Sequence, residues 1–265
     1  MDVSEVLDDL VDEQQDLDKI VDGLDDDQWA LPTPSPRWSV ADQIGHLTYF
    51  DTSAALAIED PAGFQAHKNE LMSSFADEIA VDEATLGAFR RREPAAQLLT
   101  WRNARLDLEA AARTLQNDSR VEWYGPSMGA KSFLTARLME VWAHGLDVCD
   151  AVGATHPSTD RIRHIAQLGV ITRGWSYIVR GEQPPDGDVR VELTAPSGAI
   201  WTWGSDDATD SVTGAADDFC RVVTQRRHVD DTDLQIDGEL ARDWMSKAQA
   251  FAGGATDGPA PQRAD

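Results

Sequence analysis

The sequence contains few cysteines, no long apolar run and an excess of acidic over basic residues. Its two cysteines, Cys149 and Cys220, belong to no CxxC motif or disulfide-dense framework, so we expect small core residues in a reducing compartment. No stretch approaches the roughly 18 apolar residues of a membrane-spanning helix. Residues 1–5 read MDVSE, without the basic and apolar regions of a secretory signal. We therefore expect a cytoplasmic protein with no membrane partner.

The charge balance is strongly acidic. Lys and Arg number 23 against 47 Asp and Glu, which gives a formal net charge of -24. Because phosphate binding depends on cationic side chains, we expect no nucleic-acid partner. The acids are spread along the chain rather than gathered in one tail. This favours a solvated acidic surface, and adaptation to high salt is the alternative.

Hydrophobic periodicity predicts two domains in the 265 residues. The first is an up-and-down four-helix bundle over residues 1–153, because apolar residues recur at helical spacing in four long segments. Ser39, three residues before Asp42, forms a capping box that begins the second of these helices. Weaker helical pattern covers 69–79 and 82–91. The long helices are expected at 3–24, 39–58, 95–116 and 131–152.

A second, smaller α+β domain is predicted over residues 158–253, after a stretch of small and turn-forming residues at 152–159. Alternating apolar and polar residues on both sides of a Pro-Ser-Gly turn indicate a β-hairpin. Residues 254–265 are rich in Gly, Pro and Ala and are expected to be disordered. The expected elements are a helix at 160–180, strands at 189–194, 199–203 and 234–236, and helices at 215–225 and 239–251.

Three residues on two predicted helices have the chemistry of metal ligands. Glu140 and His144 are four residues apart, so they lie one turn apart on one helix face. His46 lies among apolar residues of another helix and can face the inner seam of the bundle. Each feature also has an ordinary explanation, since Glu and His pair on helix surfaces and a buried histidine needs no metal. The residues alone leave both interpretations open.

Two longer segments resemble a known family. Residues 37–47 (RWSVADQIGHL) resemble the tryptophan-to-histidine signature of the second helix in DinB-like, thiol-dependent metalloenzymes. Residues 140–148 (EVWAHGLDV) resemble their fourth-helix ligand motif, in the Glu-and-His form typical of mycothiol-dependent maleylpyruvate isomerases. Segments similar to the sterol-carrier-like C-terminal domain of those isomerases are 190–193, 201–204, 218–220 and 248–253.

The resemblance implies a divalent metal site with three protein ligands, His46, Glu140 and His144. Three ligands leave an open position that can activate a thiol or water, as in catalytic zinc sites. Zinc is the first expectation, although two imidazoles and a carboxylate also suit iron, manganese, nickel or cobalt. The implied function is a thiol-dependent isomerase or transferase acting on a small electrophile. The alternative is a noncatalytic small-molecule-binding protein with a structural metal.

Other candidate residues have weaker support. Arg226 and Arg227 could hold the carboxylates of a small thiol cofactor, because guanidinium pairs bidentately with carboxylate, or they could belong to a surface ion-pair network. Asp147 could orient His144, although a helix-surface acid is the simpler interpretation. Three further histidines have no matching partner and are predicted to be ordinary loop or surface residues: His67, His156 and His164. A monomer is slightly favoured over an oligomer.

Overall fold

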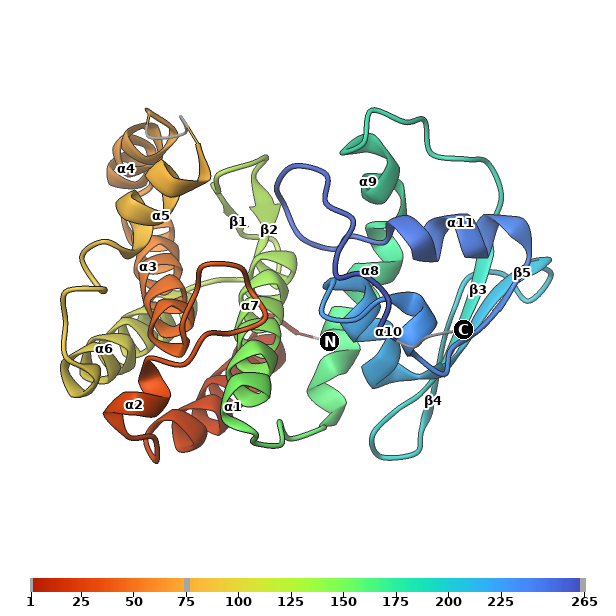
Figure 1. The fold of residues 1–265 in the computed structure, drawn as a ribbon. Helices are drawn as coiled ribbons and strands as arrows, with labels where there is room; N and C mark the ends of the chain where they lie inside the picture. Colours follow the sequence, from red (N-terminus) through yellow and green to blue (C-terminus); the bar gives the residue numbers. More distant parts are fainter. Residues whose placement is uncertain (1, 74–76, 263–265) are drawn as a thin grey trace. The chain divides into compact units, whose positions relative to one another are not determined.

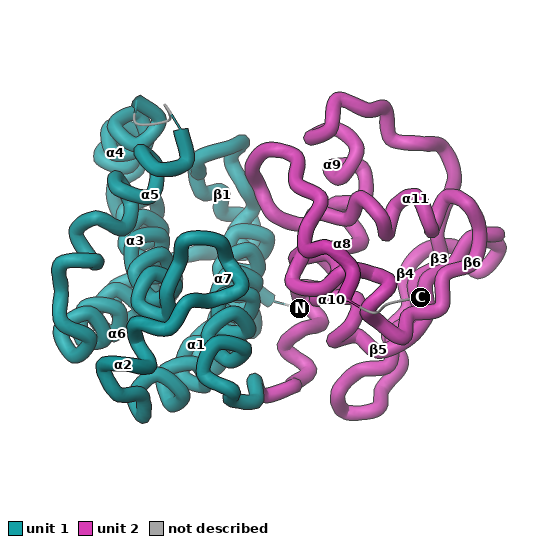
Figure 2. Tube along the Cα trace, viewed as in Figure 1, with its two compact units in different colours: residues 1–156 teal, residues 157–265 magenta. Residues whose placement is uncertain are grey.

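The computed structural model describes residues 2–73 and 77–262 (Figure 1). The chain divides into two compact units, Met1–His156 and Pro157–Asp265 (Figure 2). The division falls within the stretch of small residues at 152–159. Among the described residues, no helix combines the length and the hydropathy needed to cross a bilayer.

The first unit is a helical bundle (Figure 1). Its long helices are α1 (Val3–Val21), α3 (Val40–Glu59), α6 (Pro94–Ala112) and α7 (Ala130–Val152). Helix α3 contacts both α6 and α7, and α1 contacts α7 and α6. The core between them contains fully buried Leu10, Leu47, Trp101 and Leu138, which are spaced to face inward from their helices. The shorter elements are α2 (Asp26–Trp29), α4 (Pro61–Ser73), α5 (Glu78–Leu86), β1 (Arg120–Val121) and β2 (Met128–Gly129).

The second unit combines a mixed sheet with short helices. Its strands follow the order β4-β3-β5-β6, in which β3 and β5 are parallel and the other pairs antiparallel. Helices α10 and α11 contact β5, and α10 also contacts β3. The strands are β3 (Val189–Thr194), β4 (Ile200–Trp203), β5 (Asp210–Ala215) and β6 (Gln235–Asp237). The helices are η1 (Asp160–Ile162), α8 (Arg163–Ile171), α9 (Arg173–Ile178), α10 (Ala216–Val223), η2 (Val229–Asp231) and α11 (Glu239–Lys247).

The predicted fold class, a helical bundle followed by a smaller α+β unit, is confirmed. Several boundaries differ. The expected helix 160–180 is interrupted at Thr172, whose hydroxyl donates to the carbonyl of Leu168 at 2.7 Å, a contact that often bends helices. The weak helices expected at 69–79 and 82–91 are instead α4 and α5, and residues 74–76 lie outside the described residues. The closing helix ends at Lys247 rather than Phe251.

Residues 248–262, the described part of the segment after α11, have neither helix nor strand but make hydrogen bonds. The Gln225 side-chain amide donates to the carbonyl of Thr256 at 2.8 Å. The carboxylate of Asp231 accepts from the backbone N–H of Gln262 at 2.9 Å. Residues 263–265 of the tail, which was expected to be disordered, lie outside the described residues.

Candidate metal centre

Helices α3 and α7 carry the three side chains predicted to bind a metal. A reciprocal cap begins α3, in which the Ser39 hydroxyl accepts from the N–H of Asp42 and the Asp42 carboxylate accepts from the N–H of Ser39. His46 follows on α3. Glu140 and His144 lie one turn apart on α7. Because α3 and α7 pack against each other, residues far apart in the sequence meet between them.

The Glu140 carboxylate lies between the two imidazole rings. Its Oε2 atom is 3.2 Å from Nε2 of His46 and 3.2 Å from Nε2 of His144. One ligand atom from each residue lies within 4.8 Å of the others. Two ligands about 2.1 Å from a shared ion are separated by roughly 3.4 Å in tetrahedral geometry and roughly 3.0 Å in octahedral geometry. The two 3.2 Å separations from Glu140 are therefore compatible with a first-row divalent ion and do not select one.

Charge and exposure at the group also suit a ligand site. Burial opposes ionisation of Glu140, but hydrogen bonds from His144 and His46 outweigh it and hold the pKa of this carboxyl well below its usual range. The carboxylate is thus ionised at neutral pH, the form that binds metals. The Glu140 side chain is 27% exposed and that of His46 16% exposed. The described residues add no fourth His, Cys or carboxylate to the group.

The outer nitrogen of His144 faces an amide rather than a carboxylate. Its Nδ1 is 2.5 Å from Oε1 of Gln43, which is fully buried. Asp147, the residue considered for this role from the sequence, is 3.9 Å from the same nitrogen. Its carboxylate accepts a hydrogen bond from the Ser35 hydroxyl at 3.0 Å. This contact of Gln43 could not be predicted from the sequence, because the spacing of an amide side chain indicates no particular role.

Aromatic rings pack against the imidazoles. The Trp38 ring centroid is 5.0 Å from that of His46 and 5.9 Å from that of His144. Phe50, one turn after His46, lies 4.6 Å from it, centroid to centroid. The indole N–H of Trp38 donates to Asp82 at 3.2 Å, which fixes the ring's orientation. Trp38 lies in the segment that resembles the metalloenzyme signature, so the sequence placed it near the site without indicating this contact.

A family model described as the mycothiol maleylpyruvate isomerase N-terminal domain matches residues 10–149. The chain belongs to this family. The match spans both ligand-bearing helices. It does not include the second unit.

Curated and solved relatives extend the similarity beyond the family's N-terminal domain. Uncharacterized proteins from two Mycobacterium tuberculosis strains, CDC 1551/Oshkosh and ATCC 25618/H37Rv, are each 45% identical over 252 residues, covering 92% of this chain and 94% of the relative. Two crystal structures of mycothiol-dependent maleylpyruvate isomerase align with this chain. A histidine-to-alanine mutant aligns with a TM-score of 0.60, and a structure of the isomerase described without a mutation aligns with a TM-score of 0.58. Each alignment covers 91% of this chain and 94% of the other, at 16% identity. This similarity shows a shared fold.

The two arginines considered for cofactor binding lie after α10 in the second unit of this isomerase-family chain. Arg226 donates from Nη1 to the carbonyl of Thr224 at 3.0 Å. Arg227 is exposed and lines a small hollow that also includes Val229 and Pro259. The metal ligands belong to the other unit, so a role for these arginines at the thiol stays a prediction.

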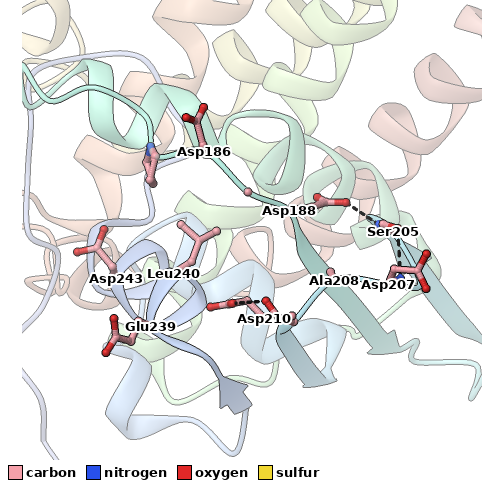
Figure 3. A pocket seen from close by; sticks show the side chains of 12 residues that line it. Asp186, Asp188, Ser205, Asp207, Ala208, Asp210, Glu239, Leu240 and Asp243 are labelled. Atoms are coloured by element: carbon pink, nitrogen blue, oxygen red, sulfur yellow. Dashed lines mark hydrogen bonds between the residues drawn. The ribbon is translucent and has the colours of Figure 1, made fainter.

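The second unit also has a solvent-open hollow of about 850 Å³ (Figure 3). No Lys or Arg is among the described residues that line it. Acidic side chains that line a hollow without a cation would repel an anionic ligand. The hollow contains none of the predicted site residues of this family member. Its acidic side chains are Asp186, Asp188, Asp207, Asp210, Glu239 and Asp243.

The prediction that three further histidines are loop or surface residues is wrong for His164, which is buried in helix α8; His156 lies in a loop, as expected, although its side chain is buried. The His156 side chain is 4% exposed, with Nε2 3.2 Å from Oε1 of Glu13. His164 is also 4% exposed. His67 is partly buried, with Nε2 3.0 Å from the Ser53 hydroxyl. A single histidine without a periodic context carries no signal of burial, which explains the error.

Proposed function

We propose that this protein binds one divalent metal ion through His46, Glu140 and His144 and uses it to activate a low-molecular-weight thiol for isomerisation or transfer on a small electrophile. The observation that carries the proposal is the convergence of three ligand atoms within 4.8 Å, with an ionised carboxylate between two imidazoles. Membership of the isomerase family supports the same assignment. Zinc is the first expectation for the metal.

The protein's own residues would hold the ion and leave one side of it accessible. When bound, the ion would supply a Lewis acid that lowers the pKa of a thiol or water in the open position. Glu140 would offset part of the ion's charge, and the Trp38 and Phe50 rings would exclude water from one side of the imidazoles. The relatives' names suggest mycothiol as the thiol. Arg226 and Arg227 are our candidates for its binding.

Further expectations concern the second unit, the binding partners, the cellular location and the oligomeric state of the protein. The second unit is proposed to be the sterol-carrier-like domain suggested by residues 190–193 and 201–204. We expect small molecules as partners, and neither nucleic acid nor membranes. A cytoplasmic location and a monomeric state stay predictions, and sedimentation equilibrium tests the latter.

Metal analysis tests the ligand set. Protein purified without added metal or chelator should contain close to one equivalent of divalent ion, measured by inductively coupled plasma mass spectrometry. The combined His46→Ala and His144→Ala variant should lose it, because Glu140 alone makes a weak site. His228→Ala, which removes an imidazole from the second unit, is the matched control and should retain the ion. A wild type without metal that also fails to take up added zinc or cobalt, or a double variant with full occupancy, contradicts the proposal.

A second measurement separates catalysis from structural bracing. In a cobalt-substituted sample, a thiol that enters the open position should change the visible absorption of the ion. Removing the metal should lower the melting temperature only slightly, because the bundle has its own buried core. Strong destabilisation without any thiol-dependent spectral change would instead favour the noncatalytic binding protein with a structural metal.

A further inference from the structure

A hydrogen-bonded chain runs from the half-buried loop before α3 to the outer nitrogen of His144. Gln43 is fully buried, and its side-chain amide connects the two ends. Its Oε1 is 2.5 Å from Nδ1 of His144, and its Nε2 is 2.8 Å from the hydroxyl oxygen of Thr33. The Thr33 hydroxyl is in turn 2.9 Å from the carbonyl oxygen of Trp38.

The chemistry of the groups fixes the direction of every bond in this chain. A carbonyl oxygen only accepts, so the Thr33 hydroxyl donates its single proton to Trp38. The hydroxyl oxygen must then accept, which turns the NH₂ group of the Gln43 amide toward Thr33. The amide oxygen is left facing His144. It can only accept, so Nδ1 of His144 carries the hydrogen.

This direction determines which nitrogen of His144 is available as a ligand. A neutral imidazole has one N–H and one lone pair, and a hydrogen on Nδ1 places the lone pair on Nε2. Nε2 is the atom that faces Glu140 at 3.2 Å. The Asp147 carboxylate, 3.9 Å from Nδ1, favours a hydrogen on the same nitrogen. The opposite tautomer would point an N–H into the position of the metal.

We propose that Gln43 is a positioning residue that holds His144 in its Nδ1–H tautomer, and that Thr33 sets the orientation of the Gln43 amide. The assignment rests on the proposed metal-binding function for its consequence, because the tautomer presents the Nε2 lone pair to the ion. Partners of this kind typically change metal affinity by about 10- to 100-fold. Thr33 thereby acts on a ligand that it does not touch.

Three variants test the chain through zinc affinity, measured by competition with a chromophoric chelator. Gln43→Leu removes the acceptor and should weaken binding by about 10- to 100-fold. Gln43→Glu keeps an oxygen that faces Nδ1 and should restore affinity to within a few-fold of wild type. Thr33→Val removes the partner that orients the amide, so the amide can rotate and present its NH₂ group to His144. Its loss should approach that of Gln43→Leu.

Coupling between the two sites separates this mechanism from a packing effect. Thr33→Val should weaken binding in the wild type but change it little in the Gln43→Leu background, since Thr33 acts only through the amide. Thr48→Val is the matched control. It removes another buried hydroxyl, which bonds the carbonyl of Ile44 on α3 at 2.6 Å, and should leave affinity unchanged. Equal effects of Thr33→Val in both backgrounds would overturn the proposal.

The tautomer itself is observable without metal. Long-range ¹H–¹⁵N spectra of the metal-free protein distinguish a protonated ring nitrogen from one with a lone pair, and His144→Gln assigns the signal. Without metal, Nε2–H can also donate to the Glu140 carboxylate, so the diagnostic signal is the hydrogen on Nδ1: we expect it in wild type and expect Thr33→Val to lose it while keeping Nε2–H. An unchanged tautomer in both Thr33→Val and Gln43→Leu would refute the positioning role. A wild type that binds no metal would refute the proposed function instead. The spectrum would still show whether Gln43 and Thr33 determine which ring nitrogen of His144 carries hydrogen.

Discussion

Arg137 and Asp51 form a buried ion pair between α3 and α7, the two helices that carry the proposed metal ligands. Their side chains are 4% and 0% exposed, with Arg137 Nη2 2.8 Å from Asp51 Oδ1. The Gln14 amide donates to the other carboxylate oxygen at 3.2 Å. Arg137 lies one turn before Glu140 on α7, so the pair fixes α3 and α7 close to the proposed site.

Removing the cation of this pair should destabilise the bundle strongly. Arg137→Met leaves the Asp51 carboxylate buried without its partner, and we expect the free energy of unfolding to fall by about 3–5 kcal/mol. Urea unfolding followed by circular dichroism measures the change. Arg137→Met combined with Asp51→Leu removes both charges and should recover much of the loss. A single variant as stable as wild type would show that the pair contributes nothing.

The three candidate ligands could be selected from the sequence, but the residues proposed to orient them could not. His46, Glu140 and His144 have side chains typical of metal sites and lie in segments that resemble a family signature. Gln43 lies within one of those segments, yet glutamine occurs in many environments. Its proposed role depends on Thr33, which lies within the proline-rich loop of residues 31–36, and no local pattern specifies how that loop returns to α3.

Helices α1 and α6 are joined by a cluster of charges around Asp18. Arg105 Nη1 is 2.6 Å from the Asp18 carboxylate, and Arg102 also bonds it, at 3.0 Å through Nε. Burial raises the pKa of Asp18, but the hydrogen bond from Arg102 and the charge of Arg105 outweigh it and lower that pKa below its ordinary value. The cluster therefore links stability to pH.

We expect Asp18 to stabilise the fold at neutral pH and to lose that effect in acid. Because its folded pKa lies below the unfolded value of about 3.9, the unfolded chain binds the proton first as the pH falls. The stabilisation is complete above about pH 5 and disappears as the pH drops through the folded pKa. Asp18→Asn should cost about 2 kcal/mol at pH 7 and progressively less below pH 4, measured by urea unfolding at each pH.

Asp22→Asn is the matched control for this dependence. Asp22 also pairs with Arg102, at 2.6 Å, but its side chain is 60% exposed, and surface pairs contribute about 0–1 kcal/mol. Its effect should be small at every pH. If Asp18→Asn had the same cost at pH 7 and at pH 3, the assigned pKa shift would be wrong.

Elements with strong local periodicity were predictable, whereas β5 and the β1–β2 hairpin were not. Each long helix of the bundle has an apolar stripe that appears in the sequence. Strand β5 has Val212 as its one large apolar residue, and it forms because it lies between β3 and β6. The helix interruption at Thr172 depends on a side-chain hydrogen bond, and the short hairpin of β1 and β2 depends on cross-strand hydrogen bonds. Hydrophobic periodicity records neither.

The net charge of -24 predicts that the stability of the protein increases with salt and then levels off. Acidic side chains repel one another over a screening length of about 10 Å at 0.1 M salt and about 3 Å at 1 M. We expect this repulsion to be strongest around the hollow lined by Asp186, Asp207 and their acidic neighbours (Figure 3). For a solvated acidic surface, the melting temperature should rise over the first few tenths molar of sodium chloride and change little beyond.

Paired charge removal shows where the repulsion acts. Asp186→Asn with Asp207→Asn should raise the melting temperature at low salt and reduce its dependence on salt. Asp12→Asn with Asp107→Asn removes the same charge from exposed positions of the bundle and should have a smaller effect, because Coulomb repulsion weakens with distance and screening. Equal effects would assign the repulsion to net charge instead of the hollow. A melting temperature that keeps rising to molar salt in all three proteins would favour adaptation to high salt, and one that salt leaves unchanged or lowers would exclude it.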